Sequence, residues 1–246
     1  MRTATIHKKY RLRGFTLVEI AIVLLIVTLL LTGLVPTISS QIEQRQTNET
    51  RKQLDEIQQA LVGFAVVNER FPCPASTTSN GLEDLTAGAC TLPNGGFIPA
   101  ATLGLAPTNS QGLAVDAWNN PIRYAVTSSY ANAFTTAGGM KANGLLSLAV
   151  NLDLQVCSTS TGIGSSNCAP GTTLVSNGVP AVIFSTGKNG ANGLTNLDET
   201  ANIHTGASAS YKTFVTHDMS PTFDDLVVWI SPNILFNRMV AAGKLP

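Results

Sequence analysis

Gly14, Phe15 and Glu19 are the residues near the N-terminus whose types and spacing could support chemistry. Gly14 ends a leader, residues 1–14, that carries five basic side chains and no acidic one. Phe15 begins an apolar run over residues 15–35 in which Glu19 is the only charged residue. Glycine permits close approach of another molecule to the backbone at this border. A carboxylate in an apolar helix costs about 3 kcal/mol if it lies in lipid, so Glu19 requires a compensating partner.

The apolar run is long enough to cross a membrane. About 20 apolar residues span a bilayer core of roughly 30 Å, and the basic leader keeps its own end on the cytoplasmic side. We therefore expect residues 15–35 to form the transmembrane half of a helix. A plain signal peptide or signal anchor is the alternative, and it gives no role to Glu19.

This arrangement of Gly14, Phe15 and Glu19 resembles the class III signal of the type IV pilin family. The resemblance implies that prepilin peptidase cuts between Gly14 and Phe15 and that the new amine of Phe15 is methylated. An ordinary secretory signal is cut behind its apolar run, whereas this cut lies in front of it, so the resemblance implies that residues 15–35 stay in the mature protein. It also implies that Glu19 serves filament assembly, where we expect its carboxylate to pair with the Phe15 amine of a neighbouring subunit.

Composition limits the remaining possibilities. The chain has 246 residues, of which 44% are hydrophobic, and this leaves room for one ordinary domain beyond the apolar segment. Without residues 1–14, ten basic side chains face 15 acidic ones, a formal charge of −5. Nucleic-acid binding calls for a basic surface, so no nucleic-acid partner is expected.

Four cysteines, Cys73, Cys90, Cys157 and Cys168, form two locally spaced pairs. The sequence has no Cys-x-x-Cys, so a metal knuckle or a thioredoxin-like motif has no support. In an oxidising compartment such cysteines usually form disulfides. Three connectivities are possible for four cysteines, and the local pairs Cys73–Cys90 and Cys157–Cys168 are the simplest.

Apolar periodicity predicts the elements that position these residues. Residues 36–70 are expected to be the amphipathic half of the N-terminal helix, with one buried face formed by Leu54, Ile57, Leu61 and Phe64. Short apolar stretches at 122–126, 145–150, 181–185 and 226–230 read as strands, and 233–242 as a terminal helix. The expected fold is α+β and pilin-like: a long N-terminal helix packed on a small antiparallel sheet with long loops, in a globular domain over residues 71–246.

Part of this domain is similar to the major pseudopilins of type II secretion. The similarity rests on the segments 68–72, 81–85 and 95–99, and on the turn Asp116-Ala117-Trp118-Asn119-Asn120-Pro121-Ile122-Arg123-Tyr124. Asn119 stands where those proteins usually have glycine. Residues 128–180, which contain the second cysteine pair, have no counterpart in that group.

The loop 185–203 resembles the C-terminal loop of the major pseudopilins, which binds calcium. Calcium takes six to eight oxygen ligands, and this loop could supply them from five side chains. Asp198 is the best candidate, supported by Glu199, Asn192, Asn189 and Asn202. The alternative is a solvated loop held by its own hydrogen bonds, because only two of these residues are acidic and Lys188 opposes a cation.

The sequence gives little support for a catalytic site. His204 and His217 have no metal-ligand spacing, and the chain has no Gly-x-Ser-x-Gly elbow. Asp224 and Asp225 are interpreted as polar residues at a strand edge. We therefore expect no enzyme activity, no certain cofactor and at most a structural calcium ion.

The expected function is that of a structural subunit, a pilin or pseudopilin, in a type IV pilus or a type II secretion pseudopilus. Its expected partners are prepilin peptidase, other pilin or pseudopilin subunits, the inner-membrane assembly platform and membrane lipid. We expect a single pass through the bacterial inner membrane, with a periplasmic C-terminal domain. A minor pilin that binds a surface, DNA or secreted cargo is the alternative, followed by a membrane-anchored exported enzyme.

Overall fold

The computed structural model describes residues 14–245, apart from 145–151, 170–173, 191–195 and 204–210, and gives only the backbone of 31–38. The chain divides into two units, Met1–Arg45 and Gln46–Pro246. The helix α1, Leu17–Asn68, begins in the first unit and ends in the second. The strand expected at 145–150 lies outside the described residues, as do the side chains of 31–35 in the expected membrane segment.

The start of α1 is fixed by a reciprocal cap. The backbone N–H of Thr16 donates to Glu19 Oε2 at 2.9 Å, and the backbone N–H of Glu19 donates to the Thr16 hydroxyl at 3.2 Å. This is a capping box, in which two otherwise unpaired N–H groups of the first turn find partners. Large apolar side chains from Phe15 to Leu30 are exposed in this unit. Within the part of the chain that is described, no helix is both long and apolar enough to span a membrane.

The second half of α1 packs on the main sheet of the second unit. Leu54, Ile57 and Leu61 are buried as predicted, and they join a single core cluster with the sheet. Phe64 does not belong to this buried face: it is only half-buried, with the guanidinium of Arg70 above its ring at 5.4 Å, and Ala65 fills the corresponding core position.

The main sheet has four strands in the order β3-β4-β7-β9, and every neighbouring pair is antiparallel. Its strands are β3 Gly96–Phe97, β4 Arg123–Val126, β7 Ala181–Ser185 and β9 Leu226–Ile230. The sequence predicted three of these, β4, β7 and β9. Alternate side chains point to opposite faces of a strand, so Tyr124 and Ile183 face α1 while Ala125 and Val182 face away from it.

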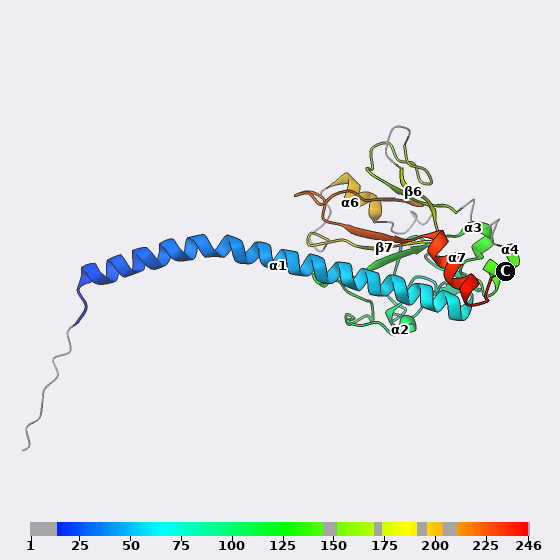
Figure 1. Ribbon diagram of the computed structural model, residues 1–246, viewed down its shortest axis with the longest axis horizontal. Helices are drawn as coiled ribbons and strands as arrows, with labels where there is room; N and C mark the ends of the chain where they lie inside the picture. Colours follow the sequence, from blue (N-terminus) through cyan, green and yellow to red (C-terminus); the bar gives the residue numbers. More distant parts are fainter. Residues whose placement is uncertain (1–13, 145–151, 170–173, 191–195, 204–210, 246) are drawn as a thin grey trace, which may run out of the picture. The chain divides into compact units, whose positions relative to one another are not determined.

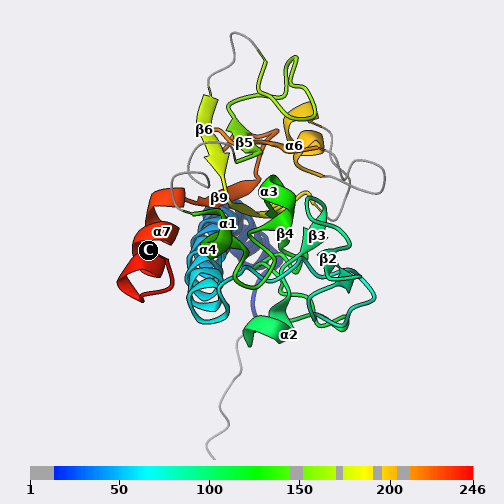
Figure 2. The same ribbon diagram turned by 90° about the vertical axis from the view of Figure 1, so that its right-hand side faces the viewer.

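A second sheet covers the face of the main sheet that α1 leaves open (Figure 2). It has the order β6-β5-β8, with β5 Leu154–Cys157, β6 Leu174–Val179 and β8 Thr213–Val215. β5 pairs with β6 antiparallel but with β8 in parallel, so this second sheet is mixed, whereas the main sheet is antiparallel as expected. The rings of Phe184 and Phe214 meet between the two sheets, with centroids 5.8 Å apart. Residues 128–180, hereafter the insert, supply two of these three strands.

The described part of the second unit also contains shorter elements. They are β1 Leu85–Thr86, β2 Ala89–Cys90, α2 Ala100–Leu103, α3 Ser129–Asn132, α4 Gly139–Asn143, α6 Leu197–Asn202 and α7 Pro232–Ala241. The terminal helix α7 begins after Ser231, with proline in its first turn, and lies beside the end of α1 (Figure 1). Proline is favoured at this position because its missing N–H would have no partner there.

Both local cysteine pairs are disulfides. Cys73 and Cys90 join the segment after α1 to β2, with their Cα atoms 5.2 Å apart. Cys157 and Cys168, with Cα atoms 5.7 Å apart, close residues 158–167, hereafter the insert loop, against the end of β5.

Candidate functional site

The register of the main sheet brings two distant segments together. Ser185, the last residue of β7, pairs with Leu226, the first residue of β9. The residues that leave β7 therefore lie beside those that enter β9, and this places Asn189 near Asp224 and Asp225. The helix α6 begins at this end of the sheet, where the Asn196 side chain caps it by accepting from the backbone N–H of Asp198 at 3.0 Å.

Three carboxylates meet here, and we call them the acidic cluster: Glu199, Asp224 and Asp225. One oxygen from each lies within 4.8 Å of the others. The Asn189 amide donates to both oxygens of Glu199 at 2.9 Å. The backbone N–H of Asp224 donates to Glu199 Oε1 at 3.1 Å. Glu199, on the first turn of α6, is thus tied to both neighbouring segments.

Three buried oxygens in this region have no hydrogen-bond partner among the described residues. They are the Oδ1 atoms of Asn189, Asp224 and Asp225. Asp225 as a residue is only 2% exposed. A buried oxygen without a partner is destabilising, and native structures contain few of them. Carboxylate and amide oxygens are the ligands that calcium prefers. The acidic cluster therefore has the donor chemistry of a site for a hard cation.

Burial raises the pKa of Asp225 to about 7, and the charges of Glu199 and Asp224 add to this effect. The hydrogen bond from Asn202 and the charge of Arg123 work in the opposite direction. Burial also raises the pKa of Asp224. Desolvation and a like charge both disfavour the ionised form of a carboxyl group. Either a proton or a cation can relieve the repulsion between these side chains.

The structure separates the predicted calcium ligands into two groups. Asn189 and Glu199 belong to the region of the acidic cluster. Asp198 is directed elsewhere, because its Oδ1 accepts from the backbone N–H of Ser160 at 2.6 Å and its Oδ2 lies 3.2 Å from His217 Nε2. Asn192 lies outside the described residues.

Asn202 contacts the cluster through its nitrogen. Its Oδ1 accepts from the backbone N–H of Val215 at 2.7 Å, and its Nδ2 donates to the Val215 carbonyl at 3.0 Å. This side chain forms hydrogen bonds with the backbone of β8 as a neighbouring strand would. Its oxygen already accepts the N–H of Val215, so we do not assign it as a cation ligand.

Asp224 and Asp225 were missed as site residues by the sequence reasoning, which placed them at a strand edge. They do precede β9, but Asp225 is buried within the acidic cluster. The signal that could have revealed them is the pairing of the predicted strands 181–185 and 226–230. An antiparallel pairing of these strands puts the two acids beside the loop that follows residue 185.

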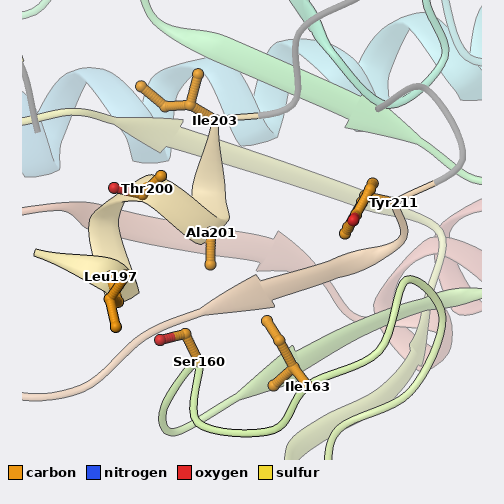
Figure 3. A pocket seen from close by; sticks show the side chains of 7 residues that line it. All are labelled: Ser160, Ile163, Leu197, Thr200, Ala201, Ile203 and Tyr211. Atoms are coloured by element: carbon orange, nitrogen blue, oxygen red, sulfur yellow. The ribbon is translucent and has the colours of Figure 1, made fainter. Parts of the chain in front are cut away.

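A cavity of about 370 Å³ lies between α6 and the insert loop (Figure 3). Its described lining consists of Ser160, Ile163, Leu197, Thr200, Ala201, Ile203 and Tyr211. Ser160 and Ile163 reach it from the insert loop, and Leu197 belongs to α6. These lining residues include no carboxylate, imidazole, thiol or amine.

The N-terminal border is accessible in the first unit. Gly14 and Phe15 precede α1 and are exposed, with 81% of Phe15 accessible to solvent. A Cβ atom built on Gly14 would meet nothing within 4 Å. A peptidase would therefore find an exposed, non-helical segment at the candidate cut.

Comparison with known protein families supports the predicted signal at the N-terminus. The family model of the prokaryotic N-terminal methylation motif matches residues 10–35. No curated protein and no solved structure matches the chain. The chain thus carries a type IV pilin-like N-terminal signal, whereas the resemblance of residues 71–246 to the major pseudopilins stays a prediction.

Proposed function

We propose that this chain is a structural subunit, a pilin or pseudopilin, that enters a filament through its N-terminal helix. The observation that carries the proposal is the methylation-motif match over residues 10–35, which contains Gly14, Phe15 and Glu19. In this proposal prepilin peptidase removes residues 1–14, and the apolar segment anchors the subunit in the inner membrane until the assembly platform transfers it to the filament.

The exposed apolar side chains of residues 15–30 support an assembly role. Soluble monomers rarely expose large contiguous apolar surfaces, which mark membrane or protein contacts. Lipid would cover this surface before assembly and the helices of neighbouring subunits would cover it afterwards. The same residues serve both states because neither environment requires a polar face.

Glu19 gives the assembly a polar contact at one position. In the free chain its carboxylate is held by Thr16, whose backbone N–H and hydroxyl donate to Oε2 at 2.9 and 3.0 Å. We propose that in the filament the carboxylate also pairs with the Phe15 amine of a neighbouring subunit. Such a pair is favourable in an apolar bundle only when both charges are present and well placed, so it would fix the register of neighbouring helices.

The test of this function is the N-terminus of the mature protein. Mass spectrometry of the membrane-extracted chain should find Phe15 as the first residue, with a methylated amine. Gly14→Val should leave the full precursor in the membrane, because a branched side chain blocks close approach at the cut. A mature N-terminus behind residue 35 would contradict the proposal.

The acidic cluster supports a second, structural role for this region. We propose that Glu199, Asp224 and Asp225, with the Asn189 amide oxygen, bind one calcium ion. The three unpartnered Oδ1 atoms carry this proposal. The cation would join α6 to the segments beside β7 and β9. Calorimetric titration of the full-length protein with calcium should show one site, and Asp225→Asn should remove it. An unchanged titration in that variant would contradict the ligand set.

A further inference from the structure

Two cavities adjoin on the face formed by α6 and the insert loop. The first, of about 370 Å³, is the cavity of Figure 3, and the second measures about 410 Å³. Ser160 and Leu197 line both cavities, so the two lie side by side. Each volume falls within the range of about 300–1,000 Å³ that is typical of small-molecule sites. This face is therefore large enough for a small ligand.

The second cavity is lined by groups that can exchange hydrogen bonds with hydroxyl groups. Besides Leu197, its described lining consists of hydroxyl side chains, one amide and one carboxylate: Thr159, Ser160, Thr161, Thr222, Asn196 and Asp198. The Asn196 amide donates one hydrogen to the Thr222 carbonyl at 2.8 Å. A primary amide carries two such hydrogens, so the second remains for a ligand. Thr161 and Thr222 are exposed, and their hydroxyls can both donate and accept.

The first cavity is mainly apolar. Ile163, Ala201 and Ile203 line it together with Leu197 and Tyr211. In Figure 3, Ile163 rises from the insert loop toward Ala201 of α6. Leu197 is 78% exposed and Tyr211 is 44% exposed. An exposed aromatic ring beside aliphatic side chains offers apolar contact area to a ligand.

Both walls of the second cavity are held in place without a ligand. The Asp198 carboxylate accepts from the backbone N–H of Ser160 at 2.6 Å and from the Thr159 hydroxyl at 3.2 Å, which fastens the insert loop to α6. The Cys157–Cys168 disulfide closes the same loop against β5. A site that is already in its binding conformation loses little conformational entropy when a ligand binds.

We propose that the two cavities together bind a neutral saccharide. A sugar ring carries hydroxyl groups around its edge and C–H groups on its faces. The edge exchanges hydrogen bonds with the hydroxyl and amide groups of the second cavity, and one face packs on Tyr211 and Leu197 in the first. On an exported subunit, this site attaches the domain to a polysaccharide. The inference depends neither on the proposed filament nor on calcium.

The lining disfavours other classes of ligand. Among the described lining residues of both cavities, the one acid or base is Asp198, whose negative charge opposes phosphates, nucleotides and acidic sugars. An entirely apolar ligand would cover the polar groups of the second cavity without replacing their hydrogen bonds to water, which is unfavourable. An inorganic cation would gain nothing from the first cavity. A neutral ligand with many hydroxyl groups meets none of these penalties.

Saturation-transfer NMR of the full-length protein tests the site. The detergent carries no sugar headgroup, and all samples contain chelator, so that the acidic cluster holds no metal ion. The probes are the methyl glycosides of glucose, galactose, mannose and N-acetylglucosamine. At least one should bind with a Kd of about 1 mM, and its ring C–H protons should receive the strongest transfer because they face Tyr211. The uronic acid of that sugar, in which a carboxylate replaces the hydroxymethyl group, should bind about tenfold more weakly.

Two variants at exposed lining positions locate the binding. Tyr211→Ala removes the ring, and Thr161→Val removes a hydroxyl at nearly constant volume. Each should weaken binding about fivefold. Thr136→Val is the matched control for the hydroxyl and Leu174→Ala for the apolar contact, because both residues are exposed and lie outside the two cavities. Both controls should bind like the wild type, and circular dichroism melts check that all four variants fold.

Three results would overturn the proposal. The first is that none of the four glycosides binds to the wild type. The second is unchanged affinity in both Tyr211→Ala and Thr161→Val, which would place the saccharide elsewhere on the molecule. The third is tighter binding of the uronic acid than of the neutral sugar, which would indicate an anion site instead.

Discussion

Asn202 donates a hydrogen bond to Asp225 Oδ2 at 2.7 Å and thereby holds one oxygen of this buried carboxylate in place. The other oxygen, Oδ1, has no partner among the described residues. The Asn202 side chain is itself fixed by two hydrogen bonds to the backbone of Val215. The amide therefore orients Asp225 so that its Oδ1 atom is available to the proposed calcium ion.

Calcium should stabilise the folded protein through this oxygen. A cation at one hundred times its Kd adds about 2.7 kcal/mol, which corresponds to a rise in Tm of roughly 5–10 °C for a domain of this size. Thermal melts of the full-length protein in calcium and in chelator measure the difference. Asp225→Asn should abolish it.

The control for this experiment is Asp198→Asn, which removes a carboxylate on the same helix. Asp198 is bonded to the insert loop and His217, outside the acidic cluster. The variant should therefore keep the full response to calcium, even if its baseline stability is lower. Loss of the response in Asp198→Asn but not in Asp225→Asn would restore the ligand set expected from the sequence.

Without calcium, stability should fall as pH rises from about 4 to about 7. The pKa of Asp225 is about 7 in the folded state, chiefly because of burial, against an ordinary value of 3.8. The folded state then binds more protons than the unfolded state in this range, so its stabilisation is present below the lower pKa and lost through the upper one. Asp224, whose pKa is also raised by burial, acts in the same direction.

Urea unfolding in chelator at several pH values measures this slope. Asp225→Asn should flatten it, since an amide does not titrate, and saturating calcium should do the same by holding the carboxylates ionised. Glu83 has the opposite shift, because its hydrogen bonds with Arg70 lower its pKa. Its contribution to stability is lost only as the pH falls through this lowered pKa, which lies below the pH range of this experiment. Stability that rises between about pH 4 and pH 7 in chelator would show that Asp225 is not protonated in the folded state.

Gly63→Ala should stabilise the second unit by about 0.5–1 kcal/mol. Glycine inside a helix is unfavourable relative to alanine by about this amount. A Cβ atom on Gly63 would meet nothing within 4 Å, so the substitution adds helix propensity without a clash. Gly96→Ala is the contrasting control, because its Cβ would overlap the Cβ of Pro74. Urea unfolding should move in opposite directions for the two variants.

The sequence predicted the elements whose signals are local. The strands β7 and β9 and the helix α7 are short apolar segments bounded by glycine, asparagine, serine or proline, and turn chemistry marks their ends. The sequence analysis predicted no strand at β5, β6 or β8, and the parallel pair of β5 with β8 joins segments that are distant in the sequence. No local pattern specifies such a pairing.

The candidate site was also predicted only where its signals are local in the sequence. The loop 185–203 was identified from its oxygen-rich side chains, and it does contribute Asn189 and Glu199. Its other predicted acid, Asp198, is committed to Ser160 in the insert, a contact that depends on the tertiary fold. Asp225 became part of the site through the register of β7 and β9, which composition alone does not reveal.

Glu19→Ala should separate processing from assembly. The cut lies between Gly14 and Phe15, so the variant should still be cleaved and should remain in the membrane through its apolar segment. Breaking a buried ion pair costs about 3–5 kcal/mol, which is more than a hundredfold in affinity at roughly 1.4 kcal/mol per factor of ten. The variant should therefore be nearly absent from purified filaments. Glu43→Ala, which changes the next carboxylate along α1, is the matched control and should be incorporated normally. Normal incorporation of Glu19→Ala would show that apolar packing alone sets the assembly.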